Sequence, residues 1–96
     1  MGSLFKKDDR ELIIMSREGN DQAFQTLISK YNALVFKVSY DFVKEYYTAQ
    51  DISQEGFIKL YDNLNEFNFP YNIKKWLCKV DKNLSKNYLK KQEVKV

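Results

Sequence analysis

Histidine is absent from this 96-residue chain, which has one cysteine, one proline and three glycines. The absence of histidine excludes Ser-His-Asp and Cys-His catalysis, and with only one cysteine it argues against a zinc site. No glycine-rich phosphate-binding loop is present. A single cysteine cannot form an intrachain disulfide and fits a reducing compartment, so we expect a cytoplasmic protein. We therefore predict a protein that is not an enzyme, with no catalytic residue, metal or cofactor.

Long hydrophobic runs are also missing. No apolar segment approaches the roughly 18 residues that span a bilayer, and the charged start, Met1–Asp9, lacks the apolar part of a signal peptide. Scarce glycine and proline, with no Asn-Gly or Asp-Gly pair, remove the usual hairpin signals. The 44% hydrophobic and 16% aromatic content supports a packed core. We predict one all-α domain over residues 1–96, a compact bundle of about four helices with no membrane partner.

Periodicity and capping residues predict four helices, at about residues 8–18, 21–44, 48–66 and 73–91. Asp8 or Asp9 can cap the first, Asn20 or Asp21 can cap the second, and Gly19 suits the end of the first. The second helix carries a long apolar stripe that we assign to the core, without chemistry: Ala23, Phe24, Leu27, Ile28, Tyr31, Leu34, Val35, Val38 and Phe42.

The third helix is predicted to start at Thr48, with Asp51 completing a capping box. Its core-facing stripe consists of Ala49, Ile52, Gly56, Phe57, Leu60, Leu64 and Phe67. The other face gathers Asp51, Gln54, Glu55, Ile58 and Asp62. This face is either a solvated acidic surface with one exposed apolar residue, or an acidic contact surface with Ile58 as its anchor for a basic partner helix. The pattern alone leaves both interpretations open.

A short loop precedes the fourth helix. Pro70 interrupts the helical pattern, and Asn72 can cap the helix that follows. The loop aromatics either fold onto the core, which we favour for Phe69, or help to form a pocket that stacks and hydrogen-bonds an unpaired base. Asn68, Tyr71 and Asn72 are the candidate residues of that pocket.

The fourth helix combines an apolar stripe with an unusual basic one. We assign Ile73, Trp76, Leu77, Val80, Leu84 and Tyr88 to its buried side, and Cys78 to an inert flank. The other side carries Lys75, Lys79, Lys82, Lys86 and Lys90. Asp81 is the only acidic residue within the predicted helix, residues 73–91. Five like charges on one stripe repel one another, so phosphate groups are a natural partner. Asn83 and Asn87 at its margin can reach base edges.

Charge divides along the chain in the same way. Residues 1–66 have 8 Lys/Arg against 11 Asp/Glu, whereas residues 67–96 have 8 lysines against 2 acids. An acidic part suited to a protein and a basic part suited to a polyanion follow from this asymmetry.

Two segments resemble region 2 of bacterial RNA polymerase sigma factors, most closely the extracytoplasmic-function class. Asp51–Tyr61, DISQEGFIKLY, is similar to the polymerase-binding helix D-x-x-Q-E-x-F-x-x-x-(Y/W). Trp76–Leu89, WLCKVDKNLSKNYL, is similar to the promoter helix W-L-x-x-(I/V)-x-x-N-x-x-x-(N/D)-x-L. Glu11–Ile13 followed by Gly19–Phe24 also resembles the family opening, and the likeness extends from about Asp9 to Lys91.

The resemblance implies a role for each candidate surface. Asp51, Gln54 and Glu55, together with Ile58 and Asp62 on the same face, would grip the clamp helices of the largest subunit of core RNA polymerase. The loop 68–72 would capture a flipped base from the non-template strand of the −10 promoter element. Asn83 and Asn87 would contact the −10 element, and Lys75, Lys79, Lys86 and Lys90 would contact its phosphates.

The departures from the family pattern carry expectations of their own. Leu77 follows Trp76 where primary sigma factors have a second aromatic residue, so we expect weak promoters to be melted poorly. Pro70 and the loop aromatics leave open which base is captured. No segment resembles the −35-reading region 4, which implies an isolated domain of a longer protein or a stand-alone region 2 with a separate region 4 partner.

Other functions remain open at this point. The main alternative is a sigma-like regulatory module that binds polymerase or an anti-sigma factor without reading DNA. A general basic helical protein that binds nucleic acid without polymerase affinity is a further alternative.

Overall fold

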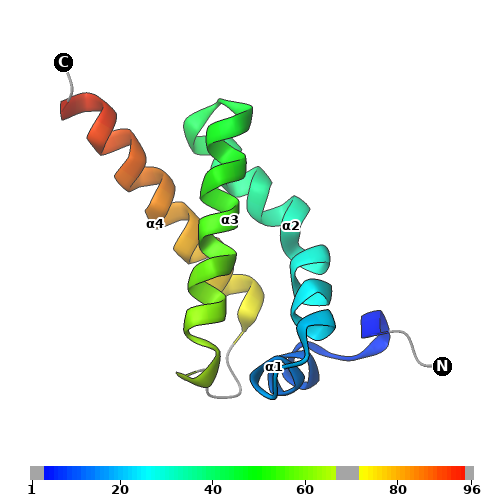
Figure 1. Ribbon diagram of the computed structural model, residues 1–96. Coiled ribbons are helices and arrows are strands. Elements are labelled where there is room, and N and C mark those ends of the chain that lie inside the picture. The colour runs from blue at the N-terminus through cyan, green and yellow to red at the C-terminus, as the bar shows by residue number, and fades with distance from the viewer. Residues whose placement is uncertain (1–3, 67–71, 95–96) are drawn as a thin grey trace.

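The computed structural model describes residues 4–66 and 72–94, and this part of the chain is built from helices (Figure 1). The α-helices are α1 (Asp9–Arg17), α2 (Asp21–Val43), α3 (Tyr46–Asp62) and α4 (Ile73–Val94), with short 3-10 turns at Leu4–Lys6 and Leu64–Glu66. The predicted all-α fold is therefore confirmed. Within the described ranges, none of the helices is both long and apolar enough to cross a membrane.

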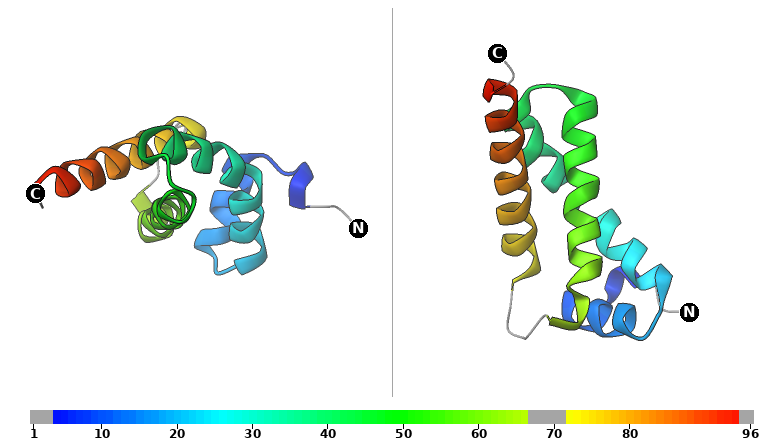
Figure 2. Two further views of the ribbon diagram at one scale, coloured as in Figure 1. Left: turned by 90° about the horizontal axis from the view of Figure 1, so that it is seen from above. Right: turned by 60° about the vertical axis from the view of Figure 1, so that its left-hand side comes forward.

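The longest helix, α2, packs against each of the other three. Helices α3 and α4 lie side by side with opposite chain directions, and α1 crosses the end of the bundle where α2 begins and α3 ends (Figure 1). The C-terminal turns of α4 extend beyond α2 and α3 (Figure 2). This arrangement puts the helix with the acidic face in direct contact with the helix that carries the lysines.

Local hydrogen bonds explain where most helices begin. The side chains of Asp8, Asn20 and Asn72 accept hydrogen bonds from the backbone N–H three residues later, at 2.9, 3.0 and 3.1 Å. Asn72 is the N-cap that the sequence predicts, and Asp8 and Asn20 are each one of the two candidates that it offers for their helices. After α1, Gly19 takes a φ of +92°, a left-handed value that glycine adopts without a steric penalty.

The start of α3 corrects one prediction. The helix begins at Tyr46, and its N-cap is Glu45, whose carboxylate accepts from the N–H groups of Tyr47 and Thr48 at 3.2 and 2.7 Å. Thr48 is therefore inside the first turn, and the predicted capping box with Asp51 is wrong. Hydrogen bonds from Thr48 and then Tyr47 lower the pKa of Glu45, which fits an anion at a helix N-terminus. The helix also ends at 62, before the predicted 66.

The core draws on all four α-helices. Its fully buried apolar side chains include Leu12, Ile13, Leu27, Val35, Leu60 and Leu77. The predicted apolar stripe of α3 is buried throughout its described members, while Phe67 lies outside the described residues. The predicted α2 stripe is only partly core. Ala23, Leu27 and Val35 are buried, but the other six members are half-buried: Phe24, Ile28, Tyr31, Leu34, Val38 and Phe42.

The buried side of α4 differs from the prediction. Ile73 and Leu77 are buried as expected, but Asp81 and Ser85 continue that line with no exposed surface. The predicted members Trp76, Val80, Leu84 and Tyr88 are half-buried instead. The helix is thus rotated so that two polar residues face its neighbours.

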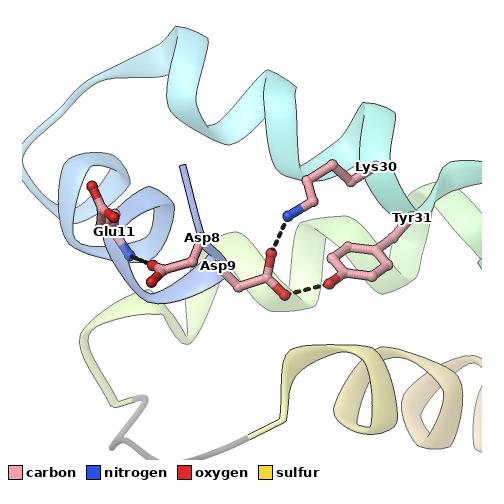
Figure 3. A network of polar contacts seen from close by, with 5 residues as sticks. All are labelled: Asp8, Asp9, Glu11, Lys30 and Tyr31. Carbon is pink, nitrogen blue, oxygen red and sulfur yellow. Dashed lines mark hydrogen bonds and ion pairs between the residues drawn. The ribbon is translucent and has the colours of Figure 1, made fainter. Parts of the chain in front are cut away.

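A polar network joins α1 to α2 (Figure 3). The carboxylate of Asp9 accepts from Lys30 Nζ at 2.6 Å and from the hydroxyl of Tyr31. Burial and the neighbouring Asp9 raise the pKa of Tyr31, so its hydroxyl keeps its proton and remains a donor. Asp8 caps the helix, which leaves Asp9 free for this bridge.

Candidate functional site

The acidic face of α3 is solvent-exposed, as the sequence predicts. Its members Asp51, Gln54, Glu55, Ile58 and Asp62 are all exposed, and the Ile58 side chain keeps 59% of its surface accessible. None of its three carboxylates forms an ion pair with another described residue. An isoleucine this exposed among uncompensated acids is consistent with a contact surface, and binding itself stays a prediction.

A groove between α2 and α3 adjoins this face. It has a volume of about 660 Å³, and its apolar lining comes from Phe24, Ile28, Phe36, Tyr46, Ile58 and Tyr61. Gln54 lines it as well. Ile58 is therefore part of one wall rather than an isolated apolar residue.

Aromatic contacts hold the two walls of the groove together. The rings of Phe24 and Tyr61 meet edge to face at 5.2 Å, and those of Phe36 and Tyr46 lie 5.3 Å apart. Tyr46, Tyr47 and Tyr61 remain more than half exposed. An apolar groove beside carboxylates suits an amphipathic helix with a basic flank.

The groove and its tyrosines were not anticipated from the sequence, which assigned Phe24 and Ile28 to the core. A groove between two helices depends on which residues the fold brings opposite each other. The available signal was Tyr61, an aromatic residue next to the acidic face at a position that matches the polymerase-binding motif.

The basic stripe of α4 is exposed along its whole length. Lys75, Lys79, Lys82, Lys86 and Lys90 face solvent, as do Asn83 and Asn87. None of these lysines pairs with an acid in the part of the chain that the structure describes. The predicted cationic surface is present, and its contact with DNA stays a prediction.

A shallower groove of about 540 Å³ lies between α2 and α4, next to the lysines. Its lining combines apolar Val38, Phe42 and Cys78 with three of the lysines, Lys75, Lys79 and Lys82, and with Asp41, whose carboxylate pairs with Lys37. Burial, and then the charge of Asp81, raise the pKa of Cys78, so this thiol stays protonated and unreactive at neutral pH. An apolar lining beside cations is the combination that unpaired nucleotides favour.

The predicted base pocket can be placed only in part. Asn68 and Tyr71 lie outside the described residues. Asn72 is exposed, and its side-chain oxygen accepts from the N–H of Lys75 at 3.1 Å. Its visible role is therefore to cap α4, and a base contact through its amide group stays a prediction.

Comparison with known proteins finds a family and several relatives for this chain. The family model described as Sigma-70 region 2 matches residues 27–94. The chain is 33% identical over 86 residues to the RNA polymerase sigma-H factor of Pseudomonas aeruginosa, covering 90% of this chain and 45% of that protein.

Two further relatives are extracytoplasmic-function (ECF) proteins. The ECF RNA polymerase sigma-E factor of Haemophilus influenzae is 31% identical over 84 residues, which cover 88% of this chain and 44% of the relative. The ECF RNA polymerase sigma factor SigW of Bacillus subtilis is 26% identical over 77 residues, which cover 80% and 41%. The chain thus spans less than half the length of each of these relatives.

Proposed function

The chain belongs to the sigma-70 region 2 family, and from this premise we propose that it acts in transcription initiation. It binds core RNA polymerase through α3 and holds the melted −10 element through α4. The observation that carries the proposal is the presence of two exposed surfaces of opposite charge on adjoining helices. The action is non-covalent and takes place in the cytoplasm, where polymerase and promoter meet.

Docking to polymerase uses the acidic face and the adjoining groove. The carboxylates of Asp51, Glu55 and Asp62 attract a basic helix and orient it. Ile58 and Tyr61 supply the apolar contact area, because exposed apolar and aromatic residues at the centre of an interface provide most of the binding energy. The clamp helices of the largest subunit are the partner that the resemblance of Asp51–Tyr61 to the polymerase-binding helix implies.

Binding to DNA uses two kinds of contact, one to phosphate groups and one to bases. The lysines of α4 neutralise phosphates, so affinity falls as salt rises. Asn83 and Asn87 offer an amide donor and acceptor to base edges. The half-buried Trp76 stands at the start of this helix, near the loop proposed to capture a flipped base.

A second candidate function uses only half of these features. A sigma-like regulatory module would bind polymerase or an anti-sigma factor through the acidic face and groove, without reading DNA. The uncompensated lysine stripe favours the DNA-binding function. Cross-linking of α4 to the non-template strand within the open complex separates the two, because the regulatory module would give no cross-link.

Asn83→Ala is expected to weaken binding to a single-stranded −10 oligonucleotide by about 1–3 kcal/mol, the value of a good base contact. Asn83 is exposed, so the fold should not change. The measurement is fluorescence anisotropy with polymerase-bound protein, using the −10 sequence and a scrambled sequence at several salt concentrations.

The matched control for this prediction is Lys86→Gln on the same helix. It should weaken both sequences equally and reduce the salt dependence by roughly one phosphate contact. If Asn83→Ala also weakens both sequences equally, Asn83 does not read a base.

A further inference from the structure

Asp81 is an acidic side chain with no exposed surface, at the place where α2, α3 and α4 meet. From α2, the hydroxyl of Ser39 donates to its Oδ2 at 2.7 Å. From α3, Gly56 faces its Oδ1. The carboxyl group of Asp81, on α4, therefore touches both α2 and α3. Helix α3 carries the acidic face, and α4 carries the lysines.

The hydrogen bonds around this carboxyl group are incomplete. Its Oδ1 and the buried Oγ of Ser85 have no hydrogen-bond partner among the described residues. A buried carboxylate with one hydrogen bond and no cation is unstable relative to the neutral acid. The site thus favours a proton on Asp81.

Gly56 shows how tightly the carboxyl group fits. A Cβ placed on Gly56 would lie 2.0 Å from Asp81 Oδ1. The two helices approach closely because position 56 has no side chain, and the carboxyl group of Asp81 occupies the space. Any change in the volume, charge or hydration of this group must therefore be accommodated at the contact between α3 and α4.

The charged surroundings act in the same direction as burial. Burial raises the pKa of Asp81 to about 7, the Ser39 hydrogen bond opposes this rise, and the charge of Glu55 on α3 adds to it. On α4 the titratable neighbour is Cys78, and the α2 neighbour, Ser39, carries no charge. Histidine is the side chain that ordinarily titrates between pH 6 and 8. The chain has none, so a pH dependence in this range is not expected from side chains with ordinary pKa values.

We propose that Asp81 is a positioning residue whose proton controls the fit of α4 against α3. The neutral carboxyl group keeps the two helices in the observed arrangement, and the ionised group draws in water and loosens their contact. The relevance of this control to transcription rests on the proposed function, because α3 and α4 carry the two binding surfaces.

The sign of the effect follows from the direction of the pKa shift. The folded-state pKa is above the ordinary value, so the folded state binds the proton more tightly than the unfolded chain. This stabilisation is complete below the ordinary value and is lost as the pH rises through about 7. The domain should thus be more stable at pH 6 than at pH 8.

Urea unfolding of the isolated chain from pH 5.5 to 8.5 tests the proposal. In the wild type, the unfolding equilibrium constant should rise about tenfold between pH 6 and pH 8. Asp81→Asn, which keeps the shape and cannot ionise, should remove this dependence, while the exposed control Asp62→Asn should retain it. Retention of the full dependence in Asp81→Asn would overturn the proposal.

A direct titration covers the case in which Asp81→Asn fails to fold. The side-chain carboxyl carbon of Asp81, followed by carbon-13 NMR in the wild type, should titrate near pH 7. In the wild type, the hydrogen bond from Ser39 favours the ionised form of Asp81. Ser39→Ala removes this bond, so the midpoint should move upward. A midpoint near the ordinary value of about 4 would rule the proposal out.

A binding measurement tests whether the proton on Asp81 affects the placement of α4. Affinity for the −10 oligonucleotide should decrease more from pH 6 to pH 8 in the wild type than in Asp81→Asn, and equal decreases would count against a positioning role. The unfolding and NMR experiments need neither polymerase nor DNA. A pH-dependent fold that binds neither partner would refute the proposed function alone, whereas pH-independent unfolding with intact binding would refute this inference alone.

Discussion

Glu55→Lys is expected to abolish binding to core RNA polymerase while the helical fold stays intact. Glu55 is exposed, and it forms no ion pair with another described residue, so its replacement breaks no ion pair within the described part of the bundle. Charge reversal in the acidic face turns attraction for a basic helix into repulsion. A loss of about 3 kcal/mol or more, over a hundredfold in affinity, is typical for close charges at an interface.

Co-purification with core polymerase and circular dichroism measure these two properties separately. The matched control is Glu18→Lys, which makes the same charge change at the exposed end of α1. This control should bind polymerase as the wild type does, since only the position of the charge differs. Undiminished co-purification of Glu55→Lys would show that α3 does not dock by this face.

Ile58→Ser separates the contribution of the groove from that of charge. Because 59% of the Ile58 side chain is exposed, its replacement should cost little stability. It removes apolar area from the groove wall, so polymerase affinity should fall without any change in the salt dependence of binding. A change in salt dependence would indicate that the groove is not a separate contact.

The second large effect is expected at Gly56. Gly56→Ala should destabilise the domain by about 3 kcal/mol, the upper end of the usual cost of overpacking, because the new Cβ would overlap with the buried carboxyl group of Asp81. In an Asp81→Ala background the same change should be neutral or stabilising by up to about 1 kcal/mol, the helix propensity that alanine gains over glycine.

Urea unfolding of the four proteins in this cycle, at one pH, measures the coupling between the two positions. Gly19→Ala serves as a control for losing a glycine without a clash, since nothing lies within 4 Å of a Cβ there and only its positive φ is strained. Equal destabilisation by Gly56→Ala in both backgrounds would mean that Asp81 does not fill the space beside Gly56.

The sequence predicts features that depend on one helix at a time. The caps at Asp8, Asn20 and Asn72 form from residues three positions apart, and the lysine stripe of α4 is a property of its own spacing. The start of α3 was misplaced because a glutamate cap, Glu45, is uncommon, whereas Thr48 matches the usual signature.

Features made by two or three helices could not be predicted in this way. Periodicity places Val80 and Leu84 inside, but burial of Asp81 instead depends on Ser39 and Gly56, which are distant in the sequence. The groove was missed for the same reason, since its walls come from α2 and α3. The exposed acidic face needed only one helix, and it was predicted residue by residue.

The match between Gly56 and Asp81 also limits the routes by which related sequences can diverge. A side chain at 56 meets the carboxyl group as long as the aspartate is present, whereas a smaller residue at 81 leaves only a small void beside the glycine. Replacement of Asp81 by a smaller residue should therefore come first, and replacement of Gly56 by alanine should follow it. Descendants with alanine at 56 should already carry a small residue at 81, and the reverse intermediate should be rare.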